Sequence, residues 1–340
     1  MDDYKKIFQQ FADNEAKGSS ELYAFLSIRV IEDLELLDII DKIPASQPKP
    51  NLFFASIQYL LTKSDAPLRN YYPSLTENPL PFDECFEPFK EFVLTHKERL
   101  LDLFHTKLVQ TNEVRRAAYL YPTFLDIQKN TNKPLTLIEI GTSAGLLLCL
   151  DAYNYEYKED NQSFRVDNFD NSITIQSENK GGNLPNTINV DLIIEKRIGI
   201  DLNIVDLNNR EEFEWMLALI WPEHQERRKQ FVAASKIANA VEKEMYEGDL
   251  LELLPNIIQS NSPENQIVLF HTHVANQFPA QLKNDFKALL NKMSYTRSIY
   301  HVYNNMYDLN LHQEHLENGK VVSKKTFLKP DGHGRWFYWN

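Results

Sequence analysis

Carboxylates, histidines and a glycine-rich turn follow apolar runs in the second half of the chain. The turn Gly141-Thr142-Ser143-Ala144-Gly145 comes directly after the apolar run 135–140, and Asp201 ends the apolar run 197–201. Glycines let a ligand approach the backbone closely, and the N–H groups of such a turn bind polar ligand atoms. A carboxylate at the end of a strand can accept hydrogen bonds from two ribose hydroxyls. This arrangement predicts a ligand-binding turn between a strand and a helix at 146–150.

Two common glycine-rich motifs do not fit the turn. A dinucleotide-binding fingerprint requires glycine at 141, 143 and 146, but the chain has Ser143 and Leu146. A P-loop is excluded because no Gly-Lys-Ser/Thr follows.

A third motif, the G-x-S-x-G nucleophile elbow of α/β-hydrolases, matches 141–145 literally. The other members of a catalytic triad are available in the required order: Asp201 or Asp249, then His271, His301 or His333. In that fold, however, the elbow follows several strands, whereas the region upstream of 135 predicts helices. A serine hydrolase using Ser143 is therefore the second hypothesis, and the favoured interpretation of Ser143 is a small loop residue beside a ligand.

Later strand ends extend the pattern. The segment 246–249 ends one apolar run in Gly248-Asp249, and 267–273 ends another in His271-Thr272-His273. Glu139-x-Gly141-x-x-x-Gly145, then Gly199-x-Asp201, then Gly248-Asp249 resembles the ordered pattern of class I S-adenosylmethionine (SAM) methyltransferases. The resemblance implies these cofactor-binding residues: Glu139, Gly141, Ser143 and Gly145 near the methionine end, Asp201 on the ribose and Asp249 by the adenine amine. The long gap between Gly145 and Asp201 predicts a β-rich insertion at about 151–195.

Several longer segments are similar to one bacterial family catalogued as a domain of unknown function. They are QTNEVRRAAYLYP, LIEIGTSAGLLLCLDAYNYEY, RIGIDLNIVDL, LALIWPEHQERR, EGDLLELLP and HGRWFYW. The similarity covers the chain nearly from end to end and supports the predicted fold. Because no reaction is assigned to that family, the similarity implies no substrate.

Candidate catalytic residues lie at the end of the fourth predicted strand. His271 and His273 would project to one side, where a neutral imidazole could remove a proton from a methyl acceptor. The pair also resembles half of a metal site, but no carboxylate accompanies it at ligand spacing, so no metal is predicted. His312 and His315 are expected to be an exposed helical pair.

Other polar residues are candidates for substrate contact. A polar group at the start of a helix and another in the closing turn could form a lid, and they comprise Asn112, Glu113, Arg116, His333 and Arg335. Tyr153, Tyr155 and Tyr157 alternate, which is typical of one face of a half-buried strand. As an alternative, these rings could line an acceptor pocket, because aromatic faces attract a sulfonium cation.

The elements that must hold these residues fall into two regions. Residues 1–130 predict a helical N-terminal domain, with helices at 22–30, 33–43, 51–63, 86–94 and 96–108. Residues 131–340 alternate strands with helices, which predicts a Rossmann-like, mainly parallel, doubly wound α/β sheet. The strands expected at 321–328 and 335–339 would close this sheet as an antiparallel hairpin.

Composition limits the partners. A formal net charge of −12 argues against general nucleic-acid binding, and no apolar run approaches the roughly 20 residues of a membrane span. Two cysteines and an N-terminus without a signal peptide predict a cytoplasmic protein. The leading hypothesis is a SAM-dependent methyltransferase acting on a small molecule. A non-catalytic nucleotide-binding or scaffold protein remains a third hypothesis, and the sequence does not determine the oligomeric state.

Overall fold

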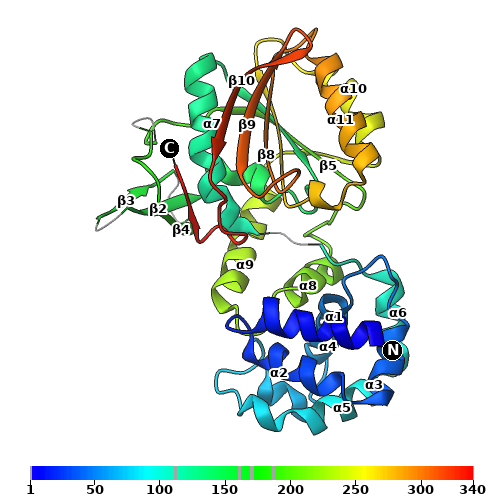
Figure 1. Ribbon diagram of the computed structural model, residues 1–340. Coiled ribbons are helices and arrows are strands. Elements are labelled where there is room, and N and C mark those ends of the chain that lie inside the picture. Colours follow the sequence, from blue (N-terminus) through cyan, green and yellow to red (C-terminus); the bar gives the residue numbers. More distant parts are fainter. Residues whose placement is uncertain (1, 111–112, 160–161, 169–171, 186–187, 340) are drawn as a thin grey trace. The chain divides into compact units, whose positions relative to one another are not determined.

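The computed structural model describes residues 2–110, 113–159, 162–168, 172–185 and 188–339 (Figure 1). The chain forms two compact units, and each unit contains two stretches of sequence. Unit 1 comprises Met1–Thr111 and Asn208–Lys229, and unit 2 comprises Asn112–Leu207 and Gln230–Asn340. The predicted boundary near residue 130 differs from these limits, because unit 2 already begins at Asn112. The chain also returns to unit 1 after Leu207.

Unit 1 is built from helices around an aromatic core. Its elements are α1 (Asp2–Phe11), a π-helix (Ala12–Ala16), α2 (Glu21–Val30), α3 (Leu34–Asp41), α4 (Lys49–Leu61), 3-10 helices at Pro67–Tyr71 and Phe82–Glu84, α5 (Phe86–Thr95), α6 (Lys97–Thr106) and α8 (Arg210–Ala218). Ser20 and Asp33 cap α2 and α3, because each side chain accepts a backbone N–H of the first turn. Phe53 and Phe54 of α4 are fully buried. The helices predicted between residues 22 and 108 are confirmed.

Unit 2 contains a seven-stranded sheet in the order β10-β9-β8-β7-β1-β5-β6. The strands are β1 (Leu135–Ile140), β5 (Ile194–Asp201), β6 (Glu244–Glu247), β7 (Gln266–Thr272), β8 (Ile299–Asn304), β9 (Leu311–Glu317) and β10 (Lys320–Phe327). The first five are parallel neighbours, and β9 and β10 are antiparallel additions. The expected mixed α/β fold with a mainly parallel sheet is confirmed.

Helices cover both faces of this sheet (Figure 1). They are α7 (Ala117–Thr131), α10 (Leu250–Ser260) and α11 (Ala280–Met293). Helix α9 (Gln225–Ala240) begins in unit 1 and ends in unit 2. Ile138, Ile267 and Leu269 form a buried cluster with α10 and α11. Phe270, one residue further along β7, instead packs edge-on against Phe124 of α7. The alternation of side chains along β7 therefore decides which helical layer each residue meets.

The insertion between β1 and β5 forms a second sheet, as predicted for 151–195. Its strands are β2 (Asn154–Glu159), β3 (Gln162–Val166), β4 (Thr174–Asn179) and β11 (Trp336–Phe337), in the order β11-β4-β2-β3. Tyr153, Tyr155 and Tyr157 are fully buried, and the Tyr155 ring stacks on Tyr121 of α7 at 4.6 Å between ring centroids. The Tyr157 hydroxyl donates to the Ala118 carbonyl at 2.9 Å. These tyrosines are therefore core residues and do not line a pocket.

The closing hairpin differs from the predicted one. Strand β10 pairs with β9 through Asn318 and Gly319, which both have positive φ, whereas residues 336–337 join the second sheet beside β4. Asn-Gly between two strands is a strong hairpin signal, because both residues tolerate the positive φ that a tight turn requires. The prediction of a helical pair for His312 and His315 was also wrong. Pairing of β9 with strands on both sides overrides the local helical spacing.

None of the helices in the described ranges is long and apolar enough to cross a lipid bilayer.

Candidate functional site

The parallel strands place the candidate site at their carboxyl ends. Numbered along the chain, β6-β5-β1-β7-β8 has the order 3-2-1-4-5, so the winding direction reverses between β1 and β7. Ligands of doubly wound sheets bind outside the carboxyl ends of the strands at such a switch point. The residues that follow β1 and β7 therefore form the centre of the candidate site.

The turn after β1 has an alternating backbone. Gly141, Ser143 and Gly145 have φ values of +69°, +50° and +70°. A Cβ atom on Gly141 would lie 2.4 Å from Cγ2 of Val274, which follows β7, so only glycine fits there. Alternating left-handed residues turn successive N–H groups toward one side and create a site for an anion.

The carboxylate of Asp201 occupies that position in unit 2. Its Oδ2 accepts the N–H of Ser143 at 2.7 Å, and its Oδ1 accepts the N–H of Asn203 at 3.1 Å. Burial raises the pKa of Asp201, while these N–H groups act in the opposite direction. In a P-loop, N–H groups of this kind bind phosphate. Here the N–H of Ser143 is bonded to the Asp201 carboxylate of the protein itself. The turn is consequently less suited to a diphosphate than to a neutral or cationic ligand.

Glu139 lies beneath the same turn and is 5% exposed. Its carboxyl accepts a hydrogen bond from Thr142 Oγ1 at 2.8 Å. Burial raises the pKa of Glu139 to about 8, and the positive charge of Arg116 only partly opposes the rise. Glu139 is therefore a buried carboxylic acid that is mostly protonated at neutral pH.

The segment after the turn is not the predicted α-helix. Leu147–Ala152 forms a 3-10 helix with a kink at Cys149. The carbonyls of Leu146 and Leu150 accept the hydroxyls of Tyr153 and Tyr155. The side chains of Leu146–Leu150 are all buried. Their packing and these two hydroxyls stabilise the segment, which lacks a regular ladder of helical hydrogen bonds. No long helix contributes a dipole to the glycine-rich turn.

Asp249 follows β6, the strand beside β5. It is exposed and caps α10, because its Oδ1 accepts the N–H of Leu251 at 2.7 Å. Together, the ends of β1, β5 and β6 carry Glu139, Asp201 and Asp249, and we call this region the acidic half of the carboxyl edge.

His271 and His273 have different surroundings. His271 is fully buried in the layer facing α11, with its Nε2 3.1 Å from Nε2 of His301. His273 follows the end of β7 and has a φ of +57°. Burial, together with the positive charge of nearby Arg116, lowers the pKa of His273 to about 3. The core position of His271 gives no support for a catalytic role, so His273 alone remains a candidate.

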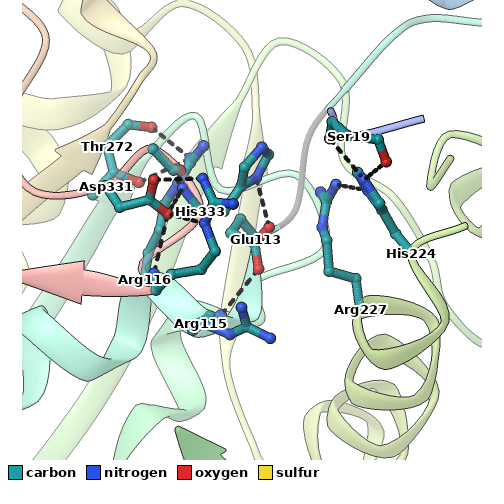
Figure 2. Close-up of polar contacts among 11 residues, drawn as sticks. Ser19, Glu113, Arg115, Arg116, His224, Arg227, Thr272, Asp331 and His333 are labelled. Atoms are coloured by element: carbon teal, nitrogen blue, oxygen red, sulfur yellow. Dashed lines mark hydrogen bonds and ion pairs between the residues drawn. The ribbon is translucent and has the colours of Figure 1, made fainter. Parts of the chain in front are cut away.

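Arg116 connects the start of α7 to β7 and to the closing turn. It is buried, and its guanidinium donates to the carbonyl and hydroxyl of Thr272, both at 3.3 Å, and to the Gly332 carbonyl at 3.0 Å. Figure 2 shows Arg116, Glu113 and His333 gathered around this point. Asn112, the remaining lid candidate of this segment, lies outside the described residues.

The closing turn is held by ion pairs. His333 Nδ1 lies 3.0 Å from Oε2 of the buried Glu113, and Arg335 makes two bonds to Asp331 at 2.9 and 2.8 Å. Burial alone would raise the pKa of Asp331, but the bonds from Arg335 and from backbone N–H groups lower it to about 2. We call this region, with the ends of β7 and β8, the basic half; its cationic residues are Arg116, Lys329 and Arg335, and His333 lies beside them.

Ser143 combines features for and against a nucleophile. Its φ of +50° is the kind of strained backbone found at an elbow, but the residue is only 4% exposed and no α-helix follows. Asp201, one candidate for the triad acid, is bonded to the backbone of Ser143 itself. His333, one candidate for the triad base, is paired with Glu113.

A serine–histidine pair also occurs in unit 1. Ser19 Oγ lies 3.0 Å from His224 Nε2, while the guanidinium of Arg227 lies 3.0 Å from His224 Nδ1 (Figure 2). Since the arginine can only donate, Nδ1 accepts and Nε2 carries the proton. His224 therefore donates toward Ser19 and does not act as a base for its hydroxyl.

Sequence reasoning found Glu139, Ser143, Asp201 and His273, but it missed two partners that orient them. Thr142 is bonded to Glu139, and Asn304 is bonded to the backbone of His273; both partners lie at strand ends, where polar residues could have been noted. Among the described residues, no cluster of three His, Cys, Asp or Glu side chains has the arrangement of a metal site.

Comparison with known families assigns the chain. Residues 5–339 match the family described as "Uncharacterized protein conserved in bacteria (DUF2332)". The chain belongs to this family. No curated protein and no solved structure matches it. Membership therefore covers nearly the whole sequence and leaves the reaction to be argued from the site.

Proposed function

We propose that the protein binds SAM and transfers its methyl group to a small molecule. The observation that carries this proposal is the position of Asp201, at the end of the strand beside β1 and bonded to the glycine-rich turn. Carboxylates at this position bind ribose hydroxyls in doubly wound folds. The two carboxylate oxygens together have four acceptor sites, so the backbone N–H groups of Ser143, Leu202 and Asn203 leave capacity for a ribose hydroxyl.

The other residues of the acidic half fit the chemistry of this cofactor. Leu202 is 78% exposed directly beside Asp201 and offers an apolar surface to a purine base. Asp249, on the next strand, offers an acceptor for an exocyclic amine. A nearby cation lowers the pKa of a carboxyl group. Glu139 would therefore ionise when the positively charged end of the ligand lies near it.

The bound cofactor would supply a methyl group on a positively charged sulfur. The chain's own contribution is then mainly orientation, since holding two reactants in line provides much of the acceleration in such a transfer. Asp201 and the glycine-rich turn would fix the donor, and the basic half would receive the acceptor. Val274 fills the space over Gly141, where the two halves meet.

Isothermal titration calorimetry with SAM and with S-adenosylhomocysteine tests the proposal. We expect micromolar binding that weakens at least tenfold, about 1.4 kcal/mol, in Asp201→Asn. The amide keeps the shape of the side chain but replaces one acceptor oxygen with a donor. Asp249→Asn should lose less, because asparagine caps a helix as well as aspartate does.

Asp167→Asn is the matched control, since that side chain is 63% exposed on the second sheet and should leave binding unchanged. Absence of binding of either ligand to the folded wild-type protein would exclude the proposal. Binding without methylation of any acceptor would favour a non-catalytic nucleotide-binding protein.

The left-handed backbone of Ser143 favours one second candidate, a serine hydrolase. Incubation with a fluorophosphonate probe distinguishes the two functions. The SAM proposal predicts no covalent labelling at Ser143, whereas stoichiometric labelling that disappears in Ser143→Ala would establish the hydrolase.

A further inference from the structure

The ends of β7 and β8 hold one imidazole in a fixed orientation. His273 and Asn305 follow these strands and have φ values of +57° and +55°. Such conformations are costly for residues other than glycine and persist where the surroundings impose them. Here the His273 N–H donates to Asn304 Oδ1 at 3.2 Å, and Asn304 Nδ2 donates to the Tyr119 hydroxyl at 3.3 Å.

The contact with Asn305 determines which nitrogen of His273 carries the proton. Asn305 Nδ2 lies 3.1 Å from His273 Nδ1. An amide nitrogen can only donate, so Nδ1 accepts. The ring is neutral, because burial and neighbouring cations lower its pKa to about 3, and its single proton must be on Nε2. His273 is therefore a hydrogen-bond donor at Nε2, which corrects the expectation of a general base.

This donor is not satisfied within the protein. Nε2 of His273 is buried and has no hydrogen-bond partner among the described residues. A buried donor without an acceptor costs about 1–3 kcal/mol, so such groups call for an explanation. The closing turn lies against the same ring, since a Cβ on Gly332 would be 3.7 Å from His273 Cε1.

The charges around the ring favour an anionic acceptor. Arg116 and Lys329 act on His273 as positive charges. Asp331 acts in the opposite direction, but its carboxylate is bonded to Arg335 by two hydrogen bonds. Cations near a buried N–H donor stabilise an oxyanion more than a neutral oxygen.

We propose that the basic half binds a carboxylate of the substrate, and that the Nε2–H of His273 donates a hydrogen bond to one of its oxygens. This inference rests on the proposed function, in which the substrate is the methyl acceptor. The acceptor would then be a small carboxylic acid. The closing turn must move for the ligand to enter, since Nε2 is buried and the turn lies against the ring and is tied to Arg116 through the Gly332 carbonyl.

Nuclear magnetic resonance of the full chain with ¹⁵N-labelled histidine tests this inference. The spectrum should show His273 neutral with its proton on Nε2. Acetate, used as the carboxylate probe at constant ionic strength, should shift this signal in a saturable way. Acetamide is the matched neutral probe and should bind at least tenfold more weakly.

Two variants complete the experiment. His273→Phe removes the donor and should weaken acetate binding at least tenfold, whereas His273→Gln keeps an N–H and should recover part of it. A proton on Nδ1 in the wild-type protein, or equal responses to acetate and acetamide, would overturn the inference even if neither variant folds. SAM binding is measured separately, so an acetate response without SAM binding would contradict only the proposed function.

Discussion

The acidic and basic halves of the carboxyl edge are built from the same kind of strand ends but differ in charge. The acidic half presents Glu139, Asp201 and Asp249, and Asp201 is bonded to backbone N–H groups. In the basic half, the carboxylates Glu113 and Asp331 lie next to His333 and Arg335. This difference is the basis for proposing a cationic methyl donor at the acidic half and a carboxylate at the basic half. Topology places the site, and the few residues after each strand determine its charge.

The largest expected effect comes from the contact at which the halves meet. Gly141→Ala adds a Cβ 2.4 Å from Val274 Cγ2 at a φ of +69°. Backbone strain and overpacking should together destabilise unit 2 by about 3 kcal/mol. Urea unfolding, combined with hydrogen exchange of the β1 amides, measures this loss.

Gly145→Ala is the matched control in the same turn. Its φ is +70°, but the new Cβ would meet only flexible ends of Lys243 and Met245 at 3.2–3.3 Å. We expect a cost of about 1 kcal/mol, from backbone strain alone. Equal losses in the two variants would show that Val274 does not constrain the turn, and Val274→Ala should relieve much of the cost of Gly141→Ala.

A smaller effect should appear in the dependence of stability on pH. The pKa of Glu139 is raised to about 8 in the folded protein, so its contribution to stability is fully present below the ordinary pKa of a glutamate, about 4.3, and is lost as pH rises from there through about 8. Glu139→Gln should remove this decline and make the protein more stable than wild type at pH 8. Thermal unfolding between pH 5 and pH 8.5 measures the difference, and parallel profiles would contradict it.

The basic half should show the opposite sign and a smaller change. The pKa of Asp331 is lowered to about 2, so its contribution is present above its ordinary range and is lost as pH falls through about 2. Asp331→Asn should therefore destabilise the protein at pH 7 and converge with wild type in strong acid. Destabilisation by Asp331→Asn that is the same at all pH values would indicate a purely steric role.

Local patterns predicted the elements that depend on nearby residues. The helix that begins near Asp33, the apolar run of β1 and the turn 141–145 followed from spacing and composition alone. Strand-end carboxylates could be predicted for the same reason, because parallel strands gather their ends at one edge. The order of the motifs along the chain therefore predicted that Glu139, Ser143 and Asp201 lie near one another.

The features that local patterns missed depend on pairing over long distances. Residues 336–337 join β4, more than 150 positions earlier in the chain, and β9 becomes a strand because β8 and β10 flank it. The segment 147–152 forms a 3-10 helix instead of an α-helix, and the hydroxyls of Tyr153 and Tyr155 bond to the carbonyls of Leu146 and Leu150 there. Local propensity is weaker than these tertiary contacts.

The sequence by itself determined a mainly parallel α/β sheet behind a helical region, a glycine-rich turn after its first strand and carboxylates at the following strand ends. Only the tertiary structure decided the state of each group. It buried Glu139 so that its carboxyl holds a proton, tied Asp201 to the turn, and moved His271 into the core while fixing the proton of His273 on Nε2. The physical reason is that protonation and orientation depend on burial and on hydrogen-bond partners, which come from residues far apart in the chain.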